Sequence, residues 1–369
     1  MLKSLSPKAR RNIARIIPFG VIWYVSSLVF LIVEYAAAGG LNKLPSTAIQ
    51  IDFEIFFFMS LAVSAVGLII GIIELVYLNN VFVKKSFTKK ILYKTFLYTL
   101  LLFVITAGTF PIAASMELNT SLLDKRVWHK LSEFLTSITH LSTAVQLAIA
   151  LGVSLFYSEI SENIGHRVLI NFFTGKYHTP KEENRIFMFA DMKSSTSIAE
   201  KIGHVKYFEL LKEYYFDLSD AIVKYSGEVY QYVGDEIVVS WEFKAGIRDN
   251  NCIKCFFAMK KDLKKRTDWY MKSFGVLPEF KAGYHFGKVT TGEIGALKKE
   301  IIFTGDVLNA TARIQGLCNH YQVDLLVSND LKKNLELATE FKVNLLGENE
   351  LRGKTEKIKL CTVTQNENS

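Results

Sequence analysis

The stretch RIFMFADMKSST, residues 185–196, and the stretch YQYVGDEIVVSW, residues 230–241, decide the fold of the second half of the chain. The first begins with an apolar run typical of a buried strand, and that run ends on the carboxylate of Asp191. The second contains two β-type runs separated by Gly-Asp-Glu, which predicts a tight hairpin with Asp235 at its tip. Because a strand end and a hairpin tip can lie side by side in one sheet, we expect Asp191 and Asp235 to face each other.

Two facing carboxylates are typical of a site that holds divalent cations on a phosphate chain, since Mg²⁺ takes a few carboxylates together with phosphates and water. Each motif alone is more often a turn or a helix cap. The segment GDVLNATARIQG, residues 305–316, adds weight to the pair. Its Asn309 and Arg313 are four residues apart and share one face of a predicted helix. An amide and a planar guanidinium suit a sugar and a charged phosphoryl group; the alternative is a helix cap and a solvated arginine.

Hydroxyl groups and lysines supply further candidates. Ser194, Ser195 and Thr196 follow the first carboxylate and offer cap hydroxyls for the start of a helix. Lys281 and Lys354 are candidates for phosphate binding, whereas an isolated lysine is more often simply exposed.

The composition indicates a membrane protein. The chain has 369 residues, 50% of them hydrophobic, a net charge of +8 and a mean hydropathy of +0.19. A basic chain can bind nucleic acid or a membrane surface. Here the basic residues flank apolar runs, so we predict a lipid bilayer as partner and no nucleic acid. The four cysteines all lie in the second half, which favours a reducing cytosol over a disulfide framework.

Four apolar runs are long enough to cross a bilayer, which needs roughly 20 residues. A cleaved signal peptide is the competing interpretation of the first run, but its apolar core is too long for one. Basic residues before the first run, between the second and third, and after the fourth place both termini in the cytoplasm. We expect a multi-pass protein of the inner (plasma) membrane with a cytoplasmic catalytic domain. The predicted spans are residues 16–38, 55–78, 95–114 and 134–157.

Two ionisable residues, Glu74 and His140, lie in or near the spans. Such groups are candidates for a functional site; the alternative is that each lies near a helix end or pairs between helices. Beyond the membrane domain, residues 1–157, we predict a juxtamembrane helix and linker, residues 158–184, with a break at Gly175 or Pro180.

Residues 185–369 alternate strand and helix patterns, which predicts one α/β sandwich domain. The Cys-x-x-Cys pair, Cys252 and Cys255, falls in a predicted amphipathic helix and is interpreted as core and not as a zinc or redox site. A hairpin of residues 280–285 and 288–294 is predicted around Phe286-Gly287. The other predicted elements are helices at residues 205–225, 244–271 and 305–318, and strands at 300–304, 323–327, 341–346 and 358–363.

Four segments, FADMKSST, YVGDE, GYHFGKVTTGEIG and GDVLNATAR, occur in the order found in class III nucleotidyl cyclases, the adenylyl and guanylyl cyclases. The chain from about residue 185 to 364 resembles the catalytic domain of this family. The resemblance implies an α+β, ferredoxin-like sandwich and a head-to-tail homodimer with sites at its interface. It implies that Asp191 and Asp235 bind two Mg²⁺ or Mn²⁺ ions. Asn309 and Arg313 of the other subunit would orient the ribose and stabilise the transition state.

The resemblance also implies groups for the phosphates. Lys281 aligns with a phosphate-binding arginine of the family, and Lys354 falls where a phosphate-binding lysine is found. The backbone around Ser195 and Thr196 would hold phosphates through amide donors.

The residues that select the base depart from the family pattern. Adenylyl cyclases usually have Lys, and guanylyl cyclases Glu, where this chain has Gln231. On the later strand they have Asp, Thr or Ser, and Cys respectively, where this chain has Ile302. Gln can donate and accept hydrogen bonds, whereas Ile can do neither. We expect ATP from its frequency in the family, with GTP or a pyrimidine triphosphate as the alternative.

The resemblance therefore predicts a membrane-anchored cyclase. The ribose 3′ oxygen attacks the α-phosphorus and releases pyrophosphate, which yields cyclic AMP from ATP. A second hypothesis is a membrane sensor that only binds nucleotide, but such domains normally lose a metal-binding Asp or the helix Arg. A third is a transporter with a regulatory domain, for which spans with few charges make a poor conduit.

Overall fold

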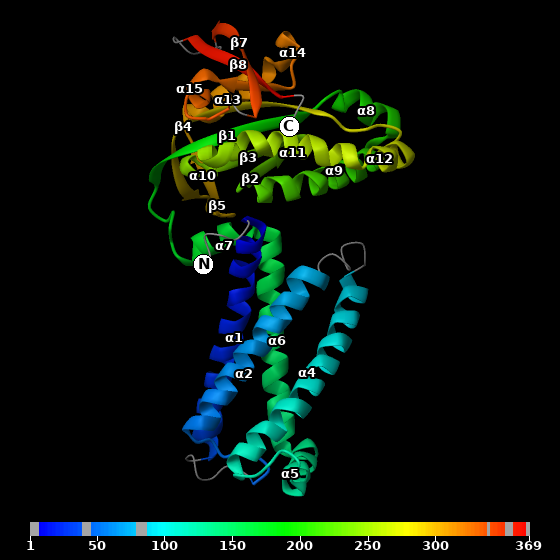
Figure 1. The fold of residues 1–369 in the computed structure, drawn as a ribbon, viewed down its shortest axis with the longest axis vertical. Coiled ribbons are helices and arrows are strands. Elements are labelled where there is room, and N and C mark those ends of the chain that lie inside the picture. Colours follow the sequence, from blue (N-terminus) through cyan, green and yellow to red (C-terminus); the bar gives the residue numbers. More distant parts are fainter. Residues whose placement is uncertain (1–6, 39–45, 79–86, 338–339, 351–356, 367–369) are drawn as a thin grey trace. The chain divides into compact units, whose positions relative to one another are not determined.

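The computed structural model describes residues 7–38, 46–78, 87–337, 340–350 and 357–366. They form two compact units: a helical one, Ala9–Ile170, and one from Asn171 onward that holds the strands (Figure 1). This division falls inside the segment that the sequence predicts as the connection. The expected fold class, a helical membrane domain followed by a mixed α and β domain, is confirmed.

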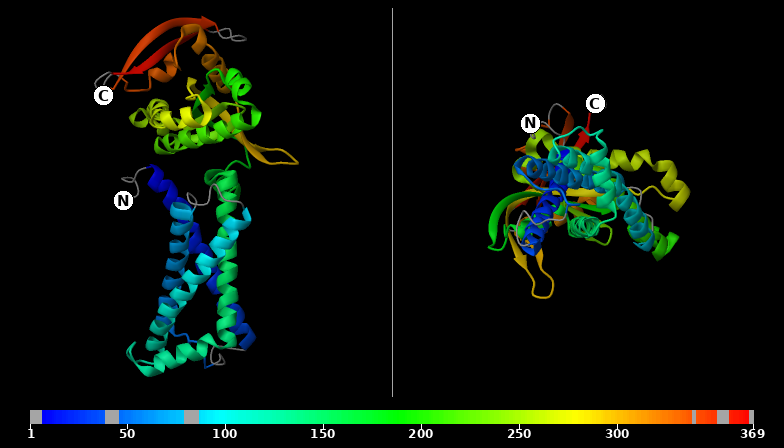
Figure 2. Two further views of the ribbon diagram at one scale, coloured as in Figure 1. Left: turned by 90° about the vertical axis from the view of Figure 1, so that its right-hand side faces the viewer. Right: turned by 90° about the horizontal axis from the view of Figure 1, so that it is seen from below.

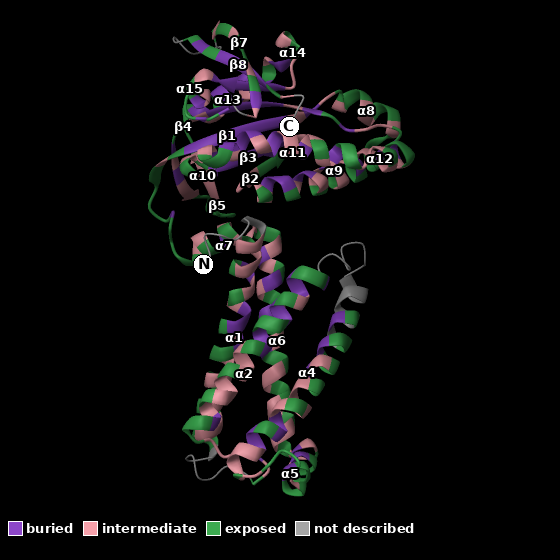
Figure 3. Ribbon diagram, viewed as in Figure 1, coloured by how far each residue is buried: buried purple, intermediate pink, exposed green. Residues whose placement is uncertain are grey.

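Four helices of the helical unit are long and apolar enough to cross a membrane. Many of their large apolar residues are exposed (Figure 3), which suits helices that face lipid. The helices of this unit are α1 (Pro7–Ala38), α2 (Phe53–Ile72) continued by the π-helix η3 (Ile73–Leu78), α4 (Phe87–Glu117), α5 (Lys125–Leu135), α6 (Ile138–Ile164) and, at its end, the first part of α7 (His166–Phe173).

The helix bounds differ from the predicted spans where polar residues continue or interrupt a helix. Helix α1 begins at Pro7, before the apolar run, because the basic residues and alanine of its first turns are good helix formers. The fourth span was predicted to begin at residue 134, but Phe134 belongs to α5. Helix α6 begins only after Ser137, whose side chain accepts the N–H of His140 and caps the helix.

The helical unit packs through small residues and interhelical hydrogen bonds. A Cβ at Gly67 of α2 would lie 2.7 Å from the carbonyl oxygen of Phe19 and 2.9 Å from Trp23 Cβ, so α1 and α2 approach closely at this glycine. The indole Nε1 of Trp23 donates to Ser154 Oγ of α6 at 3.0 Å, inside the bundle.

The two ionisable residues of the spans have structural surroundings. Glu74 is 3% exposed and pairs with Lys94 of α4, and it accepts a hydrogen bond of 2.5 Å from the Tyr98 hydroxyl. His140 lies in the first turn of α6 with its ring 5.2 Å from that of Phe134. These positions favour the alternative of interhelical pairing and a helix end.

The second unit is built on one mixed sheet of eight strands, in the order β2-β3-β1-β4-β6-β8-β7, with β5 paired to β4. Figures 1 and 2 show this unit from three directions. The described pairs are antiparallel except β4 with β6. The strands are β1 (Lys181–Met192), β2 (Glu228–Val233), β3 (Glu236–Glu242), β4 (Phe280–Ile294), β5 (Glu300–Thr304), β6 (Leu325–Ser328), β7 (Phe341–Glu350) and β8 (Lys357–Gln365).

The pleat of β1 divides the core between two faces of the sheet. Ile186, Met188 and Ala190 pack with helices α9 (His204–Lys224) and α11 (Asn251–Lys265) in the main hydrophobic cluster. The alternate residues Phe187 and Phe189 pack on the other face, against α13 (Asp306–Gly316). The helices of this unit are α8 (Ser195–Ile202), α9 (His204–Lys224), α10 (Phe243–Ile247), η4 (Arg248–Asn250), α11 (Asn251–Lys265), α12 (Thr267–Phe274), α13 (Asp306–Gly316), α14 (Cys318–Tyr321) and α15 (Asn329–Lys332).

The predicted hairpin around Phe286-Gly287 is wrong. Strand β4 runs without interruption from Phe280 to Ile294 and pairs with the full length of β1. Gly287 serves packing instead of a turn, because a Cβ there would lie 3.2 Å from Val307 Cβ of α13. A dipeptide that suggests a turn locally is here a point of close approach.

The predicted helix over residues 244–271 is broken into α10, η4, α11 and α12. Asn250 has a φ of 56° and stops the helical path before α11. Its side chain donates to the Glu336 carbonyl at 2.8 Å and accepts the Glu336 N–H at 3.0 Å. The break therefore depends on a partner that is distant in sequence. The four cysteines are buried, as the core interpretation of Cys252 and Cys255 predicts.

The seat of α13 on the sheet depends on Gly283 of β4. A Cβ there would lie 2.4 Å from the backbone N of Gln315, so we expect Gly283→Ala to destabilise this unit by about 1–3 kcal/mol or more. The melting temperature of the full chain in detergent, followed by calorimetry, measures the effect. Gly316→Ala is the control, since a Cβ at Gly316 meets no described atom within 4 Å. Equal melting temperatures for the two variants would contradict the close contact.

Candidate active site

Two carboxylates meet at one end of the central strands. Asp191 is the next-to-last residue of β1 and lies opposite Glu236 of β3, and Asp235 lies in the turn just before Glu236. The side chains of Asp191 and Asp235 are within hydrogen-bonding reach. Partial burial raises the pKa of Asp191, and the neighbouring charge of Asp235 raises it further. The expectation that these two residues face each other is therefore met within one chain.

The turn that carries Asp235 is held from behind by α9. Gly234 has a φ of 64°, which glycine adopts without strain. The Tyr215 hydroxyl of α9 donates to the Gly234 carbonyl at 2.8 Å. The position of Asp235 is thus fixed by a helix as well as by the hairpin.

Glu236 is a third carboxylate that the sequence interpretation missed. It pairs with Asp191 in the strand register, so both side chains lie on the same face of the sheet. Burial and the charges of Asp191 and Asp235 raise the pKa of Glu236 to about 7. The Gly-Asp-Glu motif predicts a turn but does not show which residue pairs with Asp191. That pairing depends on the register between β1 and β3.

Lys281 and Gln315 contact Asp191 from the other side. Lys281 of β4 pairs directly with Asp191 in the strand register, and its Nζ lies 3.6 Å from Asp191 Oδ2 and 3.2 Å from Asn319 Oδ1. Gln315 Nε2 of α13 donates to Asp191 Oδ2 at 3.4 Å. Lys281 is therefore placed at the site, and Gln315 is a second residue that sequence reasoning missed.

Asn309 and Arg313 lie on α13 but do not face the carboxylates of their own chain. The buried face of this helix includes Ala310, Ile314 and Gln315, whereas Asn309 is exposed and Arg313 half-buried. Within the described ranges, no hydrogen bond or ion pair joins either side chain to Asp191 or Asp235. The chain thus presents its two carboxylates in one place and, away from them, an amide and a guanidinium on α13.

The loop after Asp191 leads into α8, and the predicted cap is only partly right. Helix α8 begins at Ser195, but Ser194 has a φ of 55° and its hydroxyl makes no cap hydrogen bond, so the expected Ser194 cap is wrong. The Ser195 hydroxyl instead bonds to Tyr207 of α9, and Thr196 is exposed. The backbone N–H groups of the first turn have no partner inside the helix and can receive an anion.

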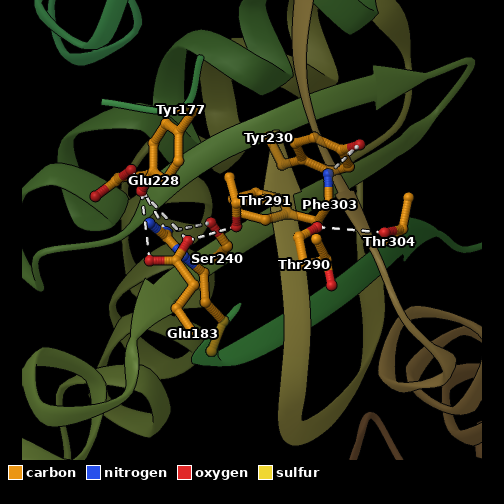
Figure 4. A network of polar contacts seen from close by, with 10 residues as sticks. Tyr177, Glu183, Glu228, Tyr230, Ser240, Thr290, Thr291, Phe303 and Thr304 are labelled. Atoms are coloured by element: carbon orange, nitrogen blue, oxygen red, sulfur yellow. Dashed lines mark hydrogen bonds and ion pairs between the residues drawn. The ribbon is translucent and has the colours of Figure 1, made fainter. Parts of the chain in front are cut away.

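The two expected base-selecting positions, Gln231 and Ile302, lie on β2 and β5, which are connected by contacts between aromatic side chains. Gln231 follows a bulge at Tyr230 and pairs with Val238, and Ile302 pairs with Gly292. The Tyr230 and Phe303 rings lie 4.9 Å apart (Figure 4), which connects β2 to β5. Lys354 lies outside the described residues.

The donor set suits a hard divalent cation. Asp191 and Asp235 are like charges in partial burial, an arrangement that a cation stabilises. Among the described residues, no group of three His, Cys, Asp or Glu is arranged to hold a metal ion. A cation at the two aspartates would therefore take its remaining ligands from water and substrate oxygens, as Mg²⁺ usually does.

Comparison with known proteins assigns the second unit. Residues 177–364 match the family described as the adenylate and guanylate cyclase catalytic domain. Adenylate cyclase 2 of Rhizobium meliloti (strain 1021) is 32% identical over 213 residues, which cover 58% of this chain and 59% of that protein. An adenylate cyclase of Anabaena cylindrica is 26% identical over 185 residues, which cover 48% of this chain and 36% of that protein. The chain thus spans less than two thirds of the length of these relatives.

A solved structure supports the same fold. A bacterial light-regulated adenylyl cyclase superimposes with a TM-score of 0.53 at 20% identity, over 62% of this chain and 66% of that chain. At this identity the likeness concerns the fold alone.

The raised pKa of Glu236 predicts a pH dependence of stability in protein freed of metal by a chelator. Between its ordinary pKa of 4.5 and the folded value of about 7, the folded chain keeps a proton that the unfolded chain releases. Stability therefore falls as pH rises through this window. We expect the melting temperature of wild type to fall relative to that of Glu236→Gln between about pH 5 and about pH 7.5. A constant difference would contradict the raised pKa, and Glu200→Gln, exposed on α8, is the control.

Proposed function

Because the chain belongs to the adenylate and guanylate cyclase catalytic domain family, we propose that it is a membrane-anchored class III cyclase. It converts a nucleoside triphosphate, in the first place ATP, to the 3′,5′-cyclic monophosphate and pyrophosphate. The observation that carries the proposal is the paired Asp191 and Asp235 at a sheet end, in a chain that also presents Asn309 and Arg313 on one helix.

The carboxylates are the residues that would hold two Mg²⁺ or Mn²⁺ ions. When bound, such ions neutralise phosphate charge and lower the pKa of the ribose 3′ hydroxyl. Through such ions, Asp191 and Asp235 would orient the triphosphate end of the substrate. Lys281, which already contacts Asp191, and Lys354 donate to phosphate oxygens, and so do the backbone N–H groups of Ser195 and Thr196.

The site is completed by a second copy of the chain. Asn309 and Arg313 point away from the carboxylates of their own protomer, which supports a head-to-tail homodimer in which each helix α13 serves the partner's carboxylates. Asn309 orients the ribose. The planar guanidinium of Arg313 donates to the α-phosphoryl oxygens as charge develops on them in the transition state.

The base contacts leave a specific alternative. Gln231 offers both a donor and an acceptor, and Ile302 offers an apolar surface. Since neither residue matches the usual adenylyl or guanylyl pair, a cyclase that acts on GTP or a pyrimidine triphosphate is the second candidate. A domain that binds nucleotide without turnover is the non-catalytic alternative.

The membrane assignment rests on the four apolar helices. The basic residues near the ends of the apolar runs support a cytoplasmic location of both termini and of the catalytic unit, at the inner membrane. Nucleoside triphosphates are available on that side.

The direct test is turnover. Membranes that contain the full chain, with Mg²⁺ or Mn²⁺ and each of the four ribonucleoside triphosphates in turn, are expected to yield a cyclic monophosphate, most rapidly from ATP. Asp191→Asn, which removes a metal-binding charge, is the matched control and should lower turnover by at least about a hundredfold. Binding of nucleotide without any cyclic product would favour the non-catalytic sensor.

Complementation tests the shared site. We expect Asp191→Ala and Arg313→Ala to be inactive alone, since each removes one half of every site. Coexpressed, they form mixed dimers with one intact site of two, so random pairing restores roughly a quarter of wild-type activity. Coexpression of Asp191→Ala with Asp235→Ala is the control, because both lesions lie in the same half. Absence of any recovery in the first pair would speak against the proposed interface.

A further inference from the structure

The strand that ends in Asp191 carries a buried arginine near its other end. Arg185 is 3% exposed, and the pleat places it on the same sheet face as Asp191. Its Nε donates to Glu183 Oε1 at 2.9 Å, and a terminal nitrogen donates to Ser240 Oγ at 3.3 Å (Figure 4). Glu228 of β2 lies 3.7 Å from the same nitrogen. The guanidinium is thus held in place by three neighbouring strands.

Arg185 also lies against an aromatic joint between two strands. Its Cζ is 4.7 Å from the centroid of the Phe303 ring, within the range of a cation–π contact. The same ring lies 5.4 Å from Phe187 and 4.9 Å from Tyr230. The Phe303 N–H donates to the Tyr230 hydroxyl at 3.4 Å. Phe303 of β5 is therefore fixed to β1 and β2 through side chains.

These side chains matter because the hydrogen-bonded ladder does not join β5 to β2. In the described part of the sheet, β5 pairs with β4, Glu300–Thr304 against Thr290–Ile294. Ile302 adjoins Phe303, and Gln231 adjoins Tyr230. The contact between Phe303 and Tyr230 therefore connects the two backbone segments that carry the expected base-selecting positions.

We propose that Arg185 is a positioning residue for base selection, which holds Phe303 against Tyr230 and thereby sets the spacing between Gln231 and Ile302. This inference rests on the proposed cyclase function and deepens it. Arg185 acts through the aromatic pair and not on the reacting atoms. Its planar fork is needed because a lysine cannot stack on a ring and donate in its plane to a carboxylate and a hydroxyl at once.

Glu183 holds the arginine and is itself held by two hydroxyls. Thr291 Oγ1 of β4 donates to Glu183 Oε1 at 2.6 Å, and the Tyr177 hydroxyl donates at 3.3 Å (Figure 4). Removal of Arg185 alone would leave this carboxylate without its cation in a half-buried position. The test therefore needs a variant that removes both charges together.

The experiment compares four full-length proteins in lipid nanodiscs. They are wild type, Arg185→Lys, the double variant Arg185→Met with Glu183→Gln, and the control Lys288→Ala. Arg185→Lys keeps the charge and loses the fork, and the double variant removes the arginine together with Glu183, the carboxylate that accepts from its Nε. Lys288→Ala breaks an exposed ion pair of 2.8 Å between Lys288 and Glu182. This ion pair joins β1 to β4, as the hydrogen bond from Thr291 to Glu183 does. Steady-state kcat and KM for ATP and GTP and the melting temperature are measured for each.

We expect both Arg185 variants to lower the ratio of kcat/KM between the better and the poorer nucleotide by about tenfold. The change should lie in KM, with kcat for the better nucleotide kept within about threefold, because the metal-binding end of the strand is untouched. Lys288→Ala should keep the wild-type ratio. The same ratio in all four proteins, whatever their melting temperatures, would overturn the inference and leave Arg185 with a structural role only.

Failure of the proposed function is a separate outcome. If wild type turns over no triphosphate, the cyclase proposal fails, and the variants are compared by their Kd for fluorescent N-methylanthraniloyl derivatives of ATP and GTP. A shift of the ATP-to-GTP binding ratio in both Arg185 variants still supports the positioning role. An unchanged ratio rejects it.

Discussion

The hydrogen-bonded register of strand β1 is the constraint on which the second unit depends. Because β1 pairs with β3 on one side and β4 on the other, each of its side chains has a fixed neighbour on both. Its residues of one parity, from Ile186 to Met192, fill the main core beneath α9 and α11. The residues between them line the opposite face, from Arg185 at one end to Asp191 at the other. A slip by one residue would exchange the two sets and remove both the core and the site.

The charges on this face form two groups, one in which positive and negative charges are matched and one with an excess of negative charge. At the Arg185 end, a cation is matched by Glu183 and Glu228, so the group is satisfied within the chain. At the Asp191 end, the carboxylates of Asp191, Asp235 and Glu236 lie close together, and Lys281 contacts Asp191. The pKa of Asp191 and that of Glu236 are raised. The excess of negative charge there is what a bound divalent cation would relieve. The fold thus separates a closed polar network from an electrostatically incomplete one.

Local sequence predicted what depends on local signals. The strand that ends on Asp191 and the turn that carries Asp235 are each encoded by a few consecutive residues, so both were found. Glu236 and Gln315 were missed because their approach to Asp191 depends on strand register and on the seat of α13. The turn expected at Gly287 and the unbroken helix through Asn250 failed for the same reason. In each case a partner distant in sequence, Val307 or Glu336, decides the conformation.

Helix α13 carries functional candidates on two different faces. Its inner face, through Gln315, contacts the carboxylate of its own chain, while its outer face carries Asn309 and Arg313. In the proposed dimer, α13 would therefore line the site of its own chain through Gln315 and supply Asn309 and Arg313 to the site of the partner. In such a dimer, a shift of α13 at one centre would also move Asn309 and Arg313 at the other, so any coupling between the two centres would pass through this helix.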